Sequence, residues 1–555
     1  MFLALEGFPL VVVSILAFII IIGAIICIHE AGHFVVARKC GILCHEFSIG
    51  MGPAIYKKKG QETMFCVRAI PIGGFVSMAG EETYDQLTKI GTTVGLNLEN
   101  NVATEIILDQ NATCMVSGTV VEKDLDGKEG KDLYITLKDS DGNVNYYQIA
   151  EDAKYIFEKE ETLQIAPYNR TFDSKPKWQR FLVLFAGAFM NFVLAIFIYL
   201  IVSFATGVPN LDSNVIGTVE EAYPASSILS VGDKILAING NNTNTWTAFQ
   251  KEMDTIKKSY AVSVEITYLH DGIEKVETLD LFTGFNSFGL SNYQSEHRST
   301  AVDIPGYDGI KGLLVGNVNI RYKDEKGTIA KDDYLTKISF DGEVTELTSW
   351  SDLVKIFSEK VITTSVDVRF EYYHKGEDGN YSLVTIDECK SIEPYTDEVL
   401  DNQRIDKIPQ LIGVAPEYHF SFLGCIGDAF KRFGDAFTLI FRTLKLLIAP
   451  SSVRQVGVQN LSSVVGIWGM IKDYIGAGFI PLLSLAGMLS VNIGIVNLLP
   501  IPALDGGRIL FLLIEAITGK KVPKKIENII TLVFMGLLFA LFIFITVFDV
   551  MRLVG

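Results

Sequence analysis

Residues 8–37 read FPLVVVSILAFIIIIGAIICIHEAGHFVVA, an almost continuous apolar run that is long enough to cross a bilayer as one helix. Near its end, His29, Glu30 and His33 form the pattern H-E-x-x-H. Because side chains four positions apart lie on one face of a helix, both imidazoles can reach one metal ion. Glu30 points to roughly the same side, where it can act as a base toward a metal-bound water.

The alternative is a chance pattern on a helix whose histidines are satisfied by other groups. The membrane setting counts against it, because a charged side chain at a helix centre costs roughly 2.5–3.5 kcal/mol even on lenient scales. Ionisable groups in such a run are usually functional, so the pattern predicts a metal site.

Two histidines leave a zinc site incomplete, since catalytic zinc normally has three protein ligands and one open position. Residues 479–504 form a second apolar run, FIPLLSLAGMLSVNIGIVNLLPIPAL, and Asp505-Gly506-Gly507 follow it directly. The paired glycines allow close backbone approach around the acid. The alternative is an interfacial turn in which Asp505 caps a helix from Gly506 to Thr518. Together with His29 and His33, the ligand interpretation of Asp505 is favoured.

The second run also carries the pattern N-x-x-P-x-x-x-L-D-G, present as Asn497, Pro500, Leu504, Asp505 and Gly506. With H-E-x-x-H, this pattern resembles the site-2 protease family of intramembrane zinc metalloproteases. The motif-bearing regions cover both ends and roughly a third of the chain.

The likeness extends to 71–75, PIGGF, and to Gln179-Arg180 and Asn191. One departure is Ala188, where many relatives have proline, and it lies away from the expected ligands. With the PDZ-like modules described below, the chain is similar to the bacterial branch that processes anti-sigma factors.

The resemblance implies a zinc metalloendopeptidase that cleaves single-span membrane proteins within the membrane. The substrates would be anti-sigma factors after a first cut, and remnant signal peptides are a further class. The implied sites are Zn²⁺ ligands at His29, His33 and Asp505, a catalytic Glu30, and substrate-binding positions at Asn497, Gly73 and Gly74.

Composition agrees with a membrane protein that carries polar modules, because 49% of residues are hydrophobic and 20% are charged. Apolar runs at about 9–37, 181–205, 479–504 and 528–549 predict four spans. The first run lacks a basic leader and a small-residue cleavage site, so we expect an uncleaved anchor. The net charge of −17 argues against nucleic acid as a partner.

The expected fold class is a membrane α-helical protein with about four transmembrane helices, a re-entrant β-hairpin, a β-rich cytoplasmic insert and two extracytoplasmic PDZ-like α+β domains. The predicted order is a first transmembrane helix (1–38), the β-hairpin (39–80), the insert (81–172), a second transmembrane helix (178–206), a first PDZ-like domain (207–284), a linker with a second PDZ-like domain (285–405), an amphipathic membrane-surface helix and loop (421–475), a third transmembrane helix (477–505), a cytoplasmic helix and loop (506–526) and a fourth transmembrane helix (527–550).

Basic residues predict the orientation in a bacterial cytoplasmic membrane. The segment before the first span has no Lys or Arg, whereas the loops at 38–180 and 505–526 carry basic clusters next to the spans. The positive-inside rule places both loops in the cytoplasm and both termini outside. His29, His33 and Asp505 then all lie toward the cytoplasmic side, which is consistent with one shared site.

Two β-rich segments lie in the first loop. Residues 46–80 predict strands beside the first helix, and in the resembling family this hairpin holds substrate by strand addition; a passive plug is the alternative. The insert at 81–171 has hairpin signals at Asp126-Gly127 and Asp141-Gly142. No role for the insert follows from its sequence.

Residues 206–420 contain a repeat of about one hundred residues. VIGTV at 215–219 recurs as VGNV at 315–318, and GDKILAING at 232–240 corresponds to DDYLTKISFDG at 332–342. The order of elements resembles a PDZ domain, which binds a peptide or protein by adding a strand. A rigid cap that sorts substrates by size is the alternative. The second copy lacks the Val-Gly-Asp turn and is the weaker match.

Residues 423–447 combine apolar and basic residues at helical spacing, which favours an amphipathic helix against membrane lipid. A fifth span is the alternative, but it would bury several charges. For the whole chain, the competing function is a catalytically inactive PDZ membrane scaffold, although such a scaffold would not need a complete set of ligands. A metal transporter would need more polar residues along its spans.

Overall fold

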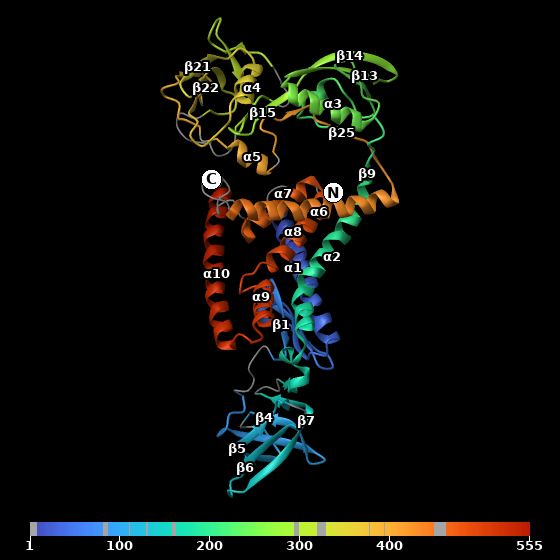
Figure 1. Cartoon of the computed structure of the whole chain (residues 1–555), viewed down its shortest axis with the longest axis vertical. Helices are drawn as coiled ribbons and strands as arrows, with labels where there is room; N and C mark the ends of the chain where they lie inside the picture. The colour runs from blue at the N-terminus through green and yellow to red at the C-terminus, as the bar shows by residue number, and fades with distance from the viewer. Residues whose placement is uncertain are drawn as a thin grey trace. The chain divides into compact units, whose positions relative to one another are not determined.

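A computed structural model of the chain describes residues 8–80, 87–109, 112–128, 131–157, 162–293, 299–318, 329–376, 378–392, 394–403, 405–448 and 462–554. The chain divides into two compact units (Figure 1). The first unit comprises residues 1–202, 429–440 and 461–555, and the second comprises residues 203–428 and 441–460.

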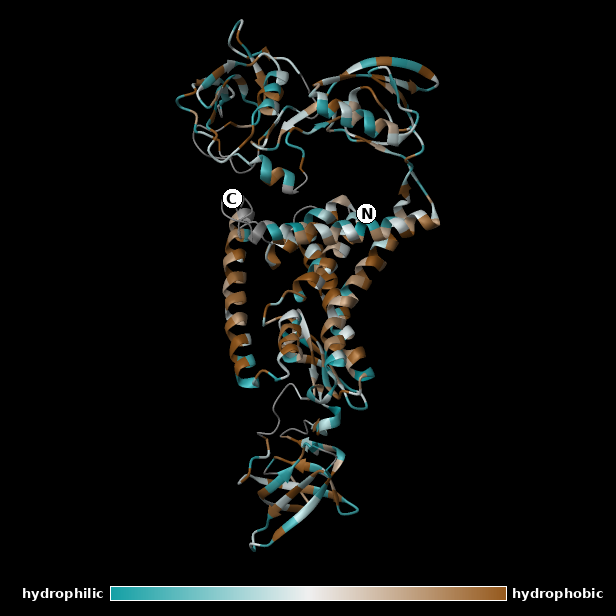
Figure 2. Cartoon of the chain, in the orientation of Figure 1, coloured by the Kyte–Doolittle hydropathy of each residue, from teal (hydrophilic) through white to brown (hydrophobic). Residues whose placement is uncertain are grey.

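Four helices in the described ranges are long and apolar enough to cross a membrane, in agreement with the four predicted spans. They are α1 (Phe8–Lys39), α2 (Lys177–Thr206), α8 (Phe479–Asn497) and α10 (Lys524–Val554). Figure 2 shows that α10 is apolar along most of its length, and its Leu532 and Phe539 are 69% and 65% exposed. Apolar exposure on this scale marks a surface that something other than water covers, and lipid fits a helix of this length.

The third predicted span, 477–505, was wrong at its C-terminal end. Helix α8 ends at Asn497, and residues 498–504 are irregular before α9 (Asp505–Thr518) begins. Pro500 and Pro502 explain the break, because proline removes a backbone donor and disfavours a helical residue before it. The break places Asp505 in the first turn of a separate helix.

Helices α1 and α2 approach each other closely at Gly32. A Cβ on Gly32 would lie 2.8 Å from the carbonyl carbon of Ala186 and 2.9 Å from the Cγ atom of Met190. Only glycine fits at this position, so the backbones of the two helices come close just before His33.

The segment predicted as a β-hairpin contains β1 (Cys44–Lys59) and β2 (Met64–Met78), which pair antiparallel with several register shifts. Gly50 and Gly73 adopt positive φ angles of 85° and 82°, conformations that glycine accepts without strain. One buried cluster contains Phe47 and Val76 of the hairpin together with residues of α1 and α2. The hairpin therefore packs beside α1, which carries His29 and His33, and beside α2.

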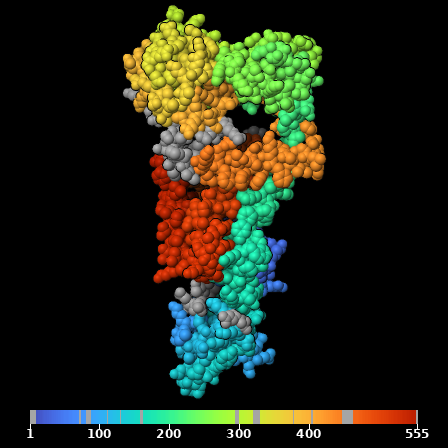
Figure 3. All heavy atoms as spheres, viewed as in Figure 1, coloured from blue at the N-terminus to red at the C-terminus, as the bar shows by residue number. Residues whose placement is uncertain are grey.

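The insert is β-rich, and five of its strands form a closed ring. Their order is β4-β3-β5-β6-β7, and a parallel pairing of β4 with β7 closes it; β8 (Thr162–Gln164) adds to β7. Asp141-Gly142 forms the tight turn between β6 and β7. Figure 3 shows the insert as one compact body, blue to cyan. The ring strands are β3 (Thr93–Glu99), β4 (Val102–Ile107), β5 (Val116–Asp124), β6 (Tyr134–Lys138) and β7 (Val144–Ile156).

The second unit contains two α+β lobes. The first lobe combines α3 (Trp246–Ser259) with a sheet of order β12-β11-β13-β14. The second lobe combines α4 (Trp350–Glu359) with a sheet of order β17-β18-β20-β22-β23. In the second sheet, β21 (Glu343–Glu346) also pairs with β20. The first sheet is β11 (Lys234–Ile238), β12 (Asn241–Asn242), β13 (Ser263–His270) and β14 (Ile273–Asp280); the second is β17 (Val302–Asp303), β18 (Lys311–Leu314), β20 (Tyr334–Phe340), β22 (Val368–Lys375) and β23 (Tyr381–Val384).

The repeat is closer in structure than in sequence. Gly232 has a φ angle of 96°, and Asp332 takes the equivalent position in the second lobe with a φ angle of 72°. In both turns the next residue is a buried aspartate that accepts a backbone N–H bond, from Ser230 to Asp233 at 2.8 Å and from Ala330 to Asp333 at 2.7 Å. The Val-Gly-Asp turn that the second sequence lacks is therefore present as a conformation.

The predicted boundaries of the first lobe, 207–284, were too short. Its strand β10 (Ile216–Val219) pairs antiparallel with β25 (Val414–Pro416), which follows the second lobe in the chain. Ile412 is 4% exposed and belongs to the same buried cluster as Ile216. The second lobe is thus inserted between parts of the first.

The remaining described strands form two smaller sheets. Residues 421–475, predicted as one amphipathic helix with a loop, contain α6 (Phe422–Ile448) and the start of α7 (Val464–Ala477). Among the described helices, α6 is outside the set of four candidate spans. The remaining elements are β9 (Val208–Pro209), β15 (Phe282–Phe285), β16 (Leu290–Ser291), β19 (Asn317–Val318), β24 (Gln410–Leu411), β26 (Tyr418–His419) and α5 (Asp397–Gln403).

Candidate metal centre

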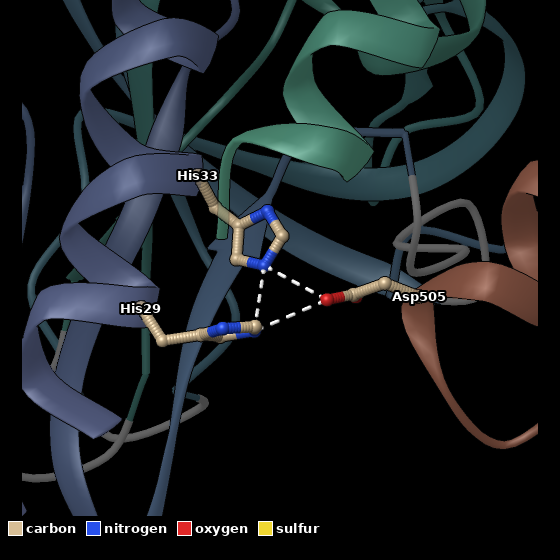
Figure 4. Close-up of side chains that lie close together, drawn as sticks. All are labelled: His29, His33 and Asp505. Atoms are coloured by element: carbon tan, nitrogen blue, oxygen red, sulfur yellow. Dashed lines mark hydrogen bonds and ion pairs between the residues drawn. The ribbon is translucent and has the colours of Figure 1, made fainter. Parts of the chain in front are cut away.

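His29 and His33 lie one turn apart on α1, and Asp505 reaches them from the first turn of α9 (Figure 4). The Oδ2 atom of Asp505 is 3.1 Å from the Nε2 atom of His29 and 3.2 Å from the Nε2 atom of His33. The two Nε2 atoms are 3.2 Å apart. Both histidines are 6% exposed. Three atoms of types that can ligate a metal ion thus form a nearly equilateral triangle, although His29 and Asp505 are 476 positions apart in the chain.

Two glycines place Asp505. A Cβ on Gly506 would overlap the carbonyl oxygen of Leu499, and one on Gly507 would overlap that of Ile501. The first turn of α9 therefore packs directly on the irregular segment that follows α8. The expectation that paired glycines permit close backbone approach at this acid agrees with these contacts.

Helix α2 presents three residues at four-residue spacing to the two histidines. The Nδ1–H group of His33 donates to the carbonyl oxygen of Val183 at 2.7 Å. Gly187, one turn on, faces both rings: a Cβ there would overlap the Nε2 atom of His33 and lie 2.7 Å from the Nε2 atom of His29. Asn191, a further turn on, has its amide group 3.2 Å from the Nδ1 atom of His29.

No sequence motif pointed to Val183 or Gly187, and Asn191 entered only through the family likeness. One signal can be detected in the second apolar run: Val183, Gly187 and Asn191 follow one another at four-residue spacing, which places them on one helix face. Its meaning depends on how closely α1 and α2 pack, which a single sequence does not show.

One cavity of about 540 Å³ brings together all seven predicted site residues. Glu30 lines it beside the hairpin, where a Cβ on Gly74 would lie 3.1 Å from the Glu30 Cγ atom and 2.8 Å from the carbonyl oxygen of Ser48. The predicted site residues in its lining are His29, Glu30, His33, Gly73, Gly74, Asn497 and Asp505.

The same cavity extends to polar side chains on α9 and α10. Arg508, Glu527, Asn528 and Thr531 line it, and the Thr531 hydroxyl donates to the carbonyl oxygen of Pro502 at 3.2 Å. The cavity that Glu30 lines is therefore also lined by polar groups of α9 and α10.

The model of Peptidase family M50 matches residues 17–541, so the chain belongs to that family. It is an intramembrane zinc metalloprotease of the site-2 type. It is 29% identical over 543 residues to the zinc metalloprotease RasP of Bacillus licheniformis, with 97% of this chain and 99% of the relative covered. The regulator of sigma-W protease RasP of Bacillus subtilis is equally similar, at 29% over 543 residues with the same coverage.

Among solved structures, the PDZ domain of an SdrC-like protein from Listeria monocytogenes is 25% identical. It covers 19% of this chain and 88% of its own, with a TM-score of 0.11. A TM-score this low assigns no fold to either lobe.

The residues present fit the zinc ion that the family implies. Tetrahedral ligands at about 2.0–2.1 Å from zinc are about 3.3–3.4 Å apart, and the three edges of the triangle measure 3.1–3.2 Å. Because His33 donates from Nδ1 to a carbonyl, its neutral ring presents a lone pair at Nε2. A lone pair and a carboxylate oxygen this close repel each other unless a cation or a proton lies between them.

Proposed function

We propose that His29, His33 and Asp505 hold the catalytic zinc ion and that Glu30 is the general base of peptide-bond hydrolysis. The observation that carries the proposal is the triangle of Nε2, Nε2 and Oδ2 atoms at 3.1–3.2 Å, with Glu30 lining the same cavity. Glu30 lies between the two histidines in sequence, and its side chain lies beside β2, where a Cβ on Gly74 would be 3.1 Å from the Glu30 Cγ atom.

Zinc at this position would polarise the peptide carbonyl and make water acidic enough to attack it at neutral pH. Glu30 accepts the proton that the attacking water loses, and the protonated carboxyl then delivers a proton to the leaving amine. The second ring nitrogen of His33 is held by Val183, which keeps this ligand from rotating during the reaction.

The hairpin is the natural place for an extended substrate. Gly73 and Gly74 bring the β2 backbone to the cavity wall next to Glu30, and strand addition offers a substrate regular backbone hydrogen bonds. Asn497, at the end of α8, also lines the cavity, and its amide can donate to and accept from substrate backbone. A membrane-spanning helix must unwind before its peptide groups reach this point, so the favoured substrate is a single-span segment.

The proposed substrate class is an anti-sigma factor that a first protease has shortened, with remnant signal peptides as a second class. A relative named as a regulator of sigma-W protease supports the first class. The basic loops favour a bacterial cytoplasmic membrane with the metal centre toward the cytoplasm and the two lobes outside. Helix α6 would rest against membrane lipid, and the lobes would bind a peptide or protein as PDZ domains do.

The proposal is tested by cleavage of a truncated single-span anti-sigma-type substrate by the purified, detergent-solubilised full-length protein. Glu30→Gln and a zinc-chelated sample are run beside it, and bound zinc is measured in each. We expect cleavage by the wild type alone, with zinc retained in Glu30→Gln.

Each result separates one part of the proposal from another. Retained cleavage in Glu30→Gln would remove Glu30 as the base. Wild-type protein that neither cleaves nor binds zinc would favour the inactive PDZ scaffold. Zinc binding without cleavage would contradict the proposed substrate class.

A further inference from the structure

His29 and His33 differ in how their second ring nitrogen is held. The Nδ1 atom of His33 faces the carbonyl oxygen of Val183 at 2.7 Å, and a carbonyl only accepts, so His33 carries its proton on Nδ1. The Nε2 atom of His29 faces the ligand triangle in the same way as that of His33. A neutral His29 that ligates through Nε2 also needs its proton on Nδ1, with an acceptor to receive it.

The group opposite the Nδ1 atom of His29 is the side-chain amide of Asn191, which is fully buried. As placed, its Nδ2 atom is 3.2 Å from the Nδ1 atom of His29, and its Oδ1 atom has no hydrogen-bond partner among the described residues. This arrangement would put a donor opposite Nδ1 and force the ring proton onto Nε2, where it would point into the metal site.

Exchanging the two ends of the amide removes the conflict. The oxygen and nitrogen of an asparagine amide have nearly the same size, and their assignment follows from the hydrogen bonds around them. With Oδ1 toward His29, the ring donates from Nδ1 and its Nε2 lone pair faces His33 and Asp505. The orphaned oxygen gains a partner, and the amide nitrogen moves to the present Oδ1 position, where it displaces no existing hydrogen bond.

We propose that Asn191 is a positioning residue that accepts a hydrogen bond from the Nδ1–H group of His29 and thereby fixes the tautomer and ring orientation of that zinc ligand. The proposal rests on the zinc-ligand set proposed above. Asn191 would act on His29 as Val183 acts on His33, one acceptor for each ring, from positions eight residues apart on the same helix face.

The surroundings of Asn191 support a fixed acceptor rather than a mobile side chain. The backbone oxygen of Asn191 accepts a hydrogen bond from the hydroxyl of Ser490 at 2.8 Å, which ties α2 to α8 at this level. Gly187, one turn before Asn191, leaves the rings room to approach the helix. Both Asn191 and Ser490 are fully buried, so protein atoms set the direction of the amide.

The test measures the zinc dissociation constant of the purified full-length protein by competition with a chromophoric chelator. Asn191→Leu keeps the approximate shape without an acceptor, and we expect zinc affinity to fall roughly 10–100-fold, the usual effect of losing a ligand's hydrogen-bond partner. Asn191→Asp restores an acceptor and should bind zinc at least as tightly as wild type. Ser490→Ala is the matched control: it removes the neighbouring hydrogen bond but leaves the amide, and its loss of zinc affinity should stay well below about tenfold.

The outcomes distinguish this inference from the function beneath it. Equal zinc affinity in Asn191→Leu and wild type would overturn the inference, and so would an equal loss in Asn191→Leu and Asn191→Asp, because packing rather than acceptance would then explain the residue. Should Asn191→Leu fail to fold, the Asn191→Asp and Ser490→Ala comparison still decides, since a purely structural role predicts weaker binding in Asn191→Asp. If His33→Ala binds zinc as tightly as wild type, the ligand set itself is wrong, whatever Asn191 does.

Discussion

Gly187 on α2 faces His33 on α1 so closely that no side chain fits between them: a Cβ on Gly187 would overlap the Nε2 atom of His33. The absence of a side chain on one helix therefore sets the position of a proposed metal ligand on another. Neither residue contacts the other through a hydrogen bond in the described structure, and the relationship is purely one of space.

Gly187→Ala should weaken zinc binding and abolish cleavage, because the added methyl group would push both imidazoles out of the triangle. Gly23→Ala is the matched control on α1, since a Cβ there meets nothing within 4 Å. Zinc content and cleavage are measured in both variants. Wild-type zinc binding in Gly187→Ala would show that α2 leaves room for a methyl group beside the His29 and His33 rings, contrary to the close packing of the structure.

Removing one partner of the buried ion pair between Arg180 and Glu515 should destabilise the protein. The Nη1 atom of Arg180 is 2.9 Å from the Oε2 atom of Glu515, with side-chain exposures of 12% and 9%, and the pair joins α2 to the helix that begins with Asp505. Breaking a buried pair leaves one charge uncompensated and costs about 3–5 kcal/mol, whereas apolar replacement of both partners is often nearly neutral.

We therefore expect Glu515→Leu to lower the free energy of unfolding by about 3–5 kcal/mol and the double variant with Arg180→Met to recover most of the loss. Denaturant unfolding of the single and double variants checks this. Additive losses in the double variant would contradict a coupled pair.

Glu62 and Arg170 should give a pH-dependent stabilisation at the junction of hairpin and insert. Arg170 donates to both carboxylate oxygens of Glu62, at 2.8 and 3.0 Å, and this hydrogen bonding lowers the pKa of Glu62 from 4.5. A carboxyl whose pKa is depressed on folding stabilises the protein above its unfolded pKa, and the contribution is lost as pH falls through the folded value.

Wild type should accordingly melt at a higher temperature than Glu62→Gln at pH 7, and the gap should close as pH falls below 4.5. The effect is modest, because both side chains are about one-third exposed. A gap that does not change with pH would exclude the ion pair as its cause.

Substitutions in the two turns, at Gly232 and at Asp332, should change the stability of their lobes in different directions. An L-residue with a left-handed backbone costs about 1–2 kcal/mol in general and less for aspartate, so Gly232→Ala should destabilise the first lobe by about 1 kcal/mol. Asp332→Gly should leave the second lobe unchanged or stabilise it by a few tenths of a kcal/mol. Hydrogen exchange of each lobe in the full-length protein measures both effects.

Local patterns carried most of the information that could be extracted from the sequence. Helical spacing alone brings His29 and His33 together, and the acid after an apolar run pointed to Asp505. The break after α8 follows from Pro500 and Pro502, whose effect is also local. These features need only a few neighbouring residues.

The rest depends on contacts that are distant in sequence. The roles of Gly187 and Asn191 follow from how closely α2 approaches α1, and a single chain records that approach only as small or polar residues in an apolar run. The turn at Asp332 was not predicted, because aspartate, unlike glycine, is not typical of positions with a positive φ angle. The pairing of β10 with β25 has no local signal at either strand.

That pairing has a consequence for how the protein is made. Val414 pairs with Val219, and at roughly 5–20 residues per second the ribosome needs about 10–40 s to make the chain between them. During that interval the second lobe is synthesised while β10 still lacks its partner strand. Its unpaired backbone N–H and C=O groups can then pair with a strand of another chain. The first lobe to be translated is therefore the last to be completed.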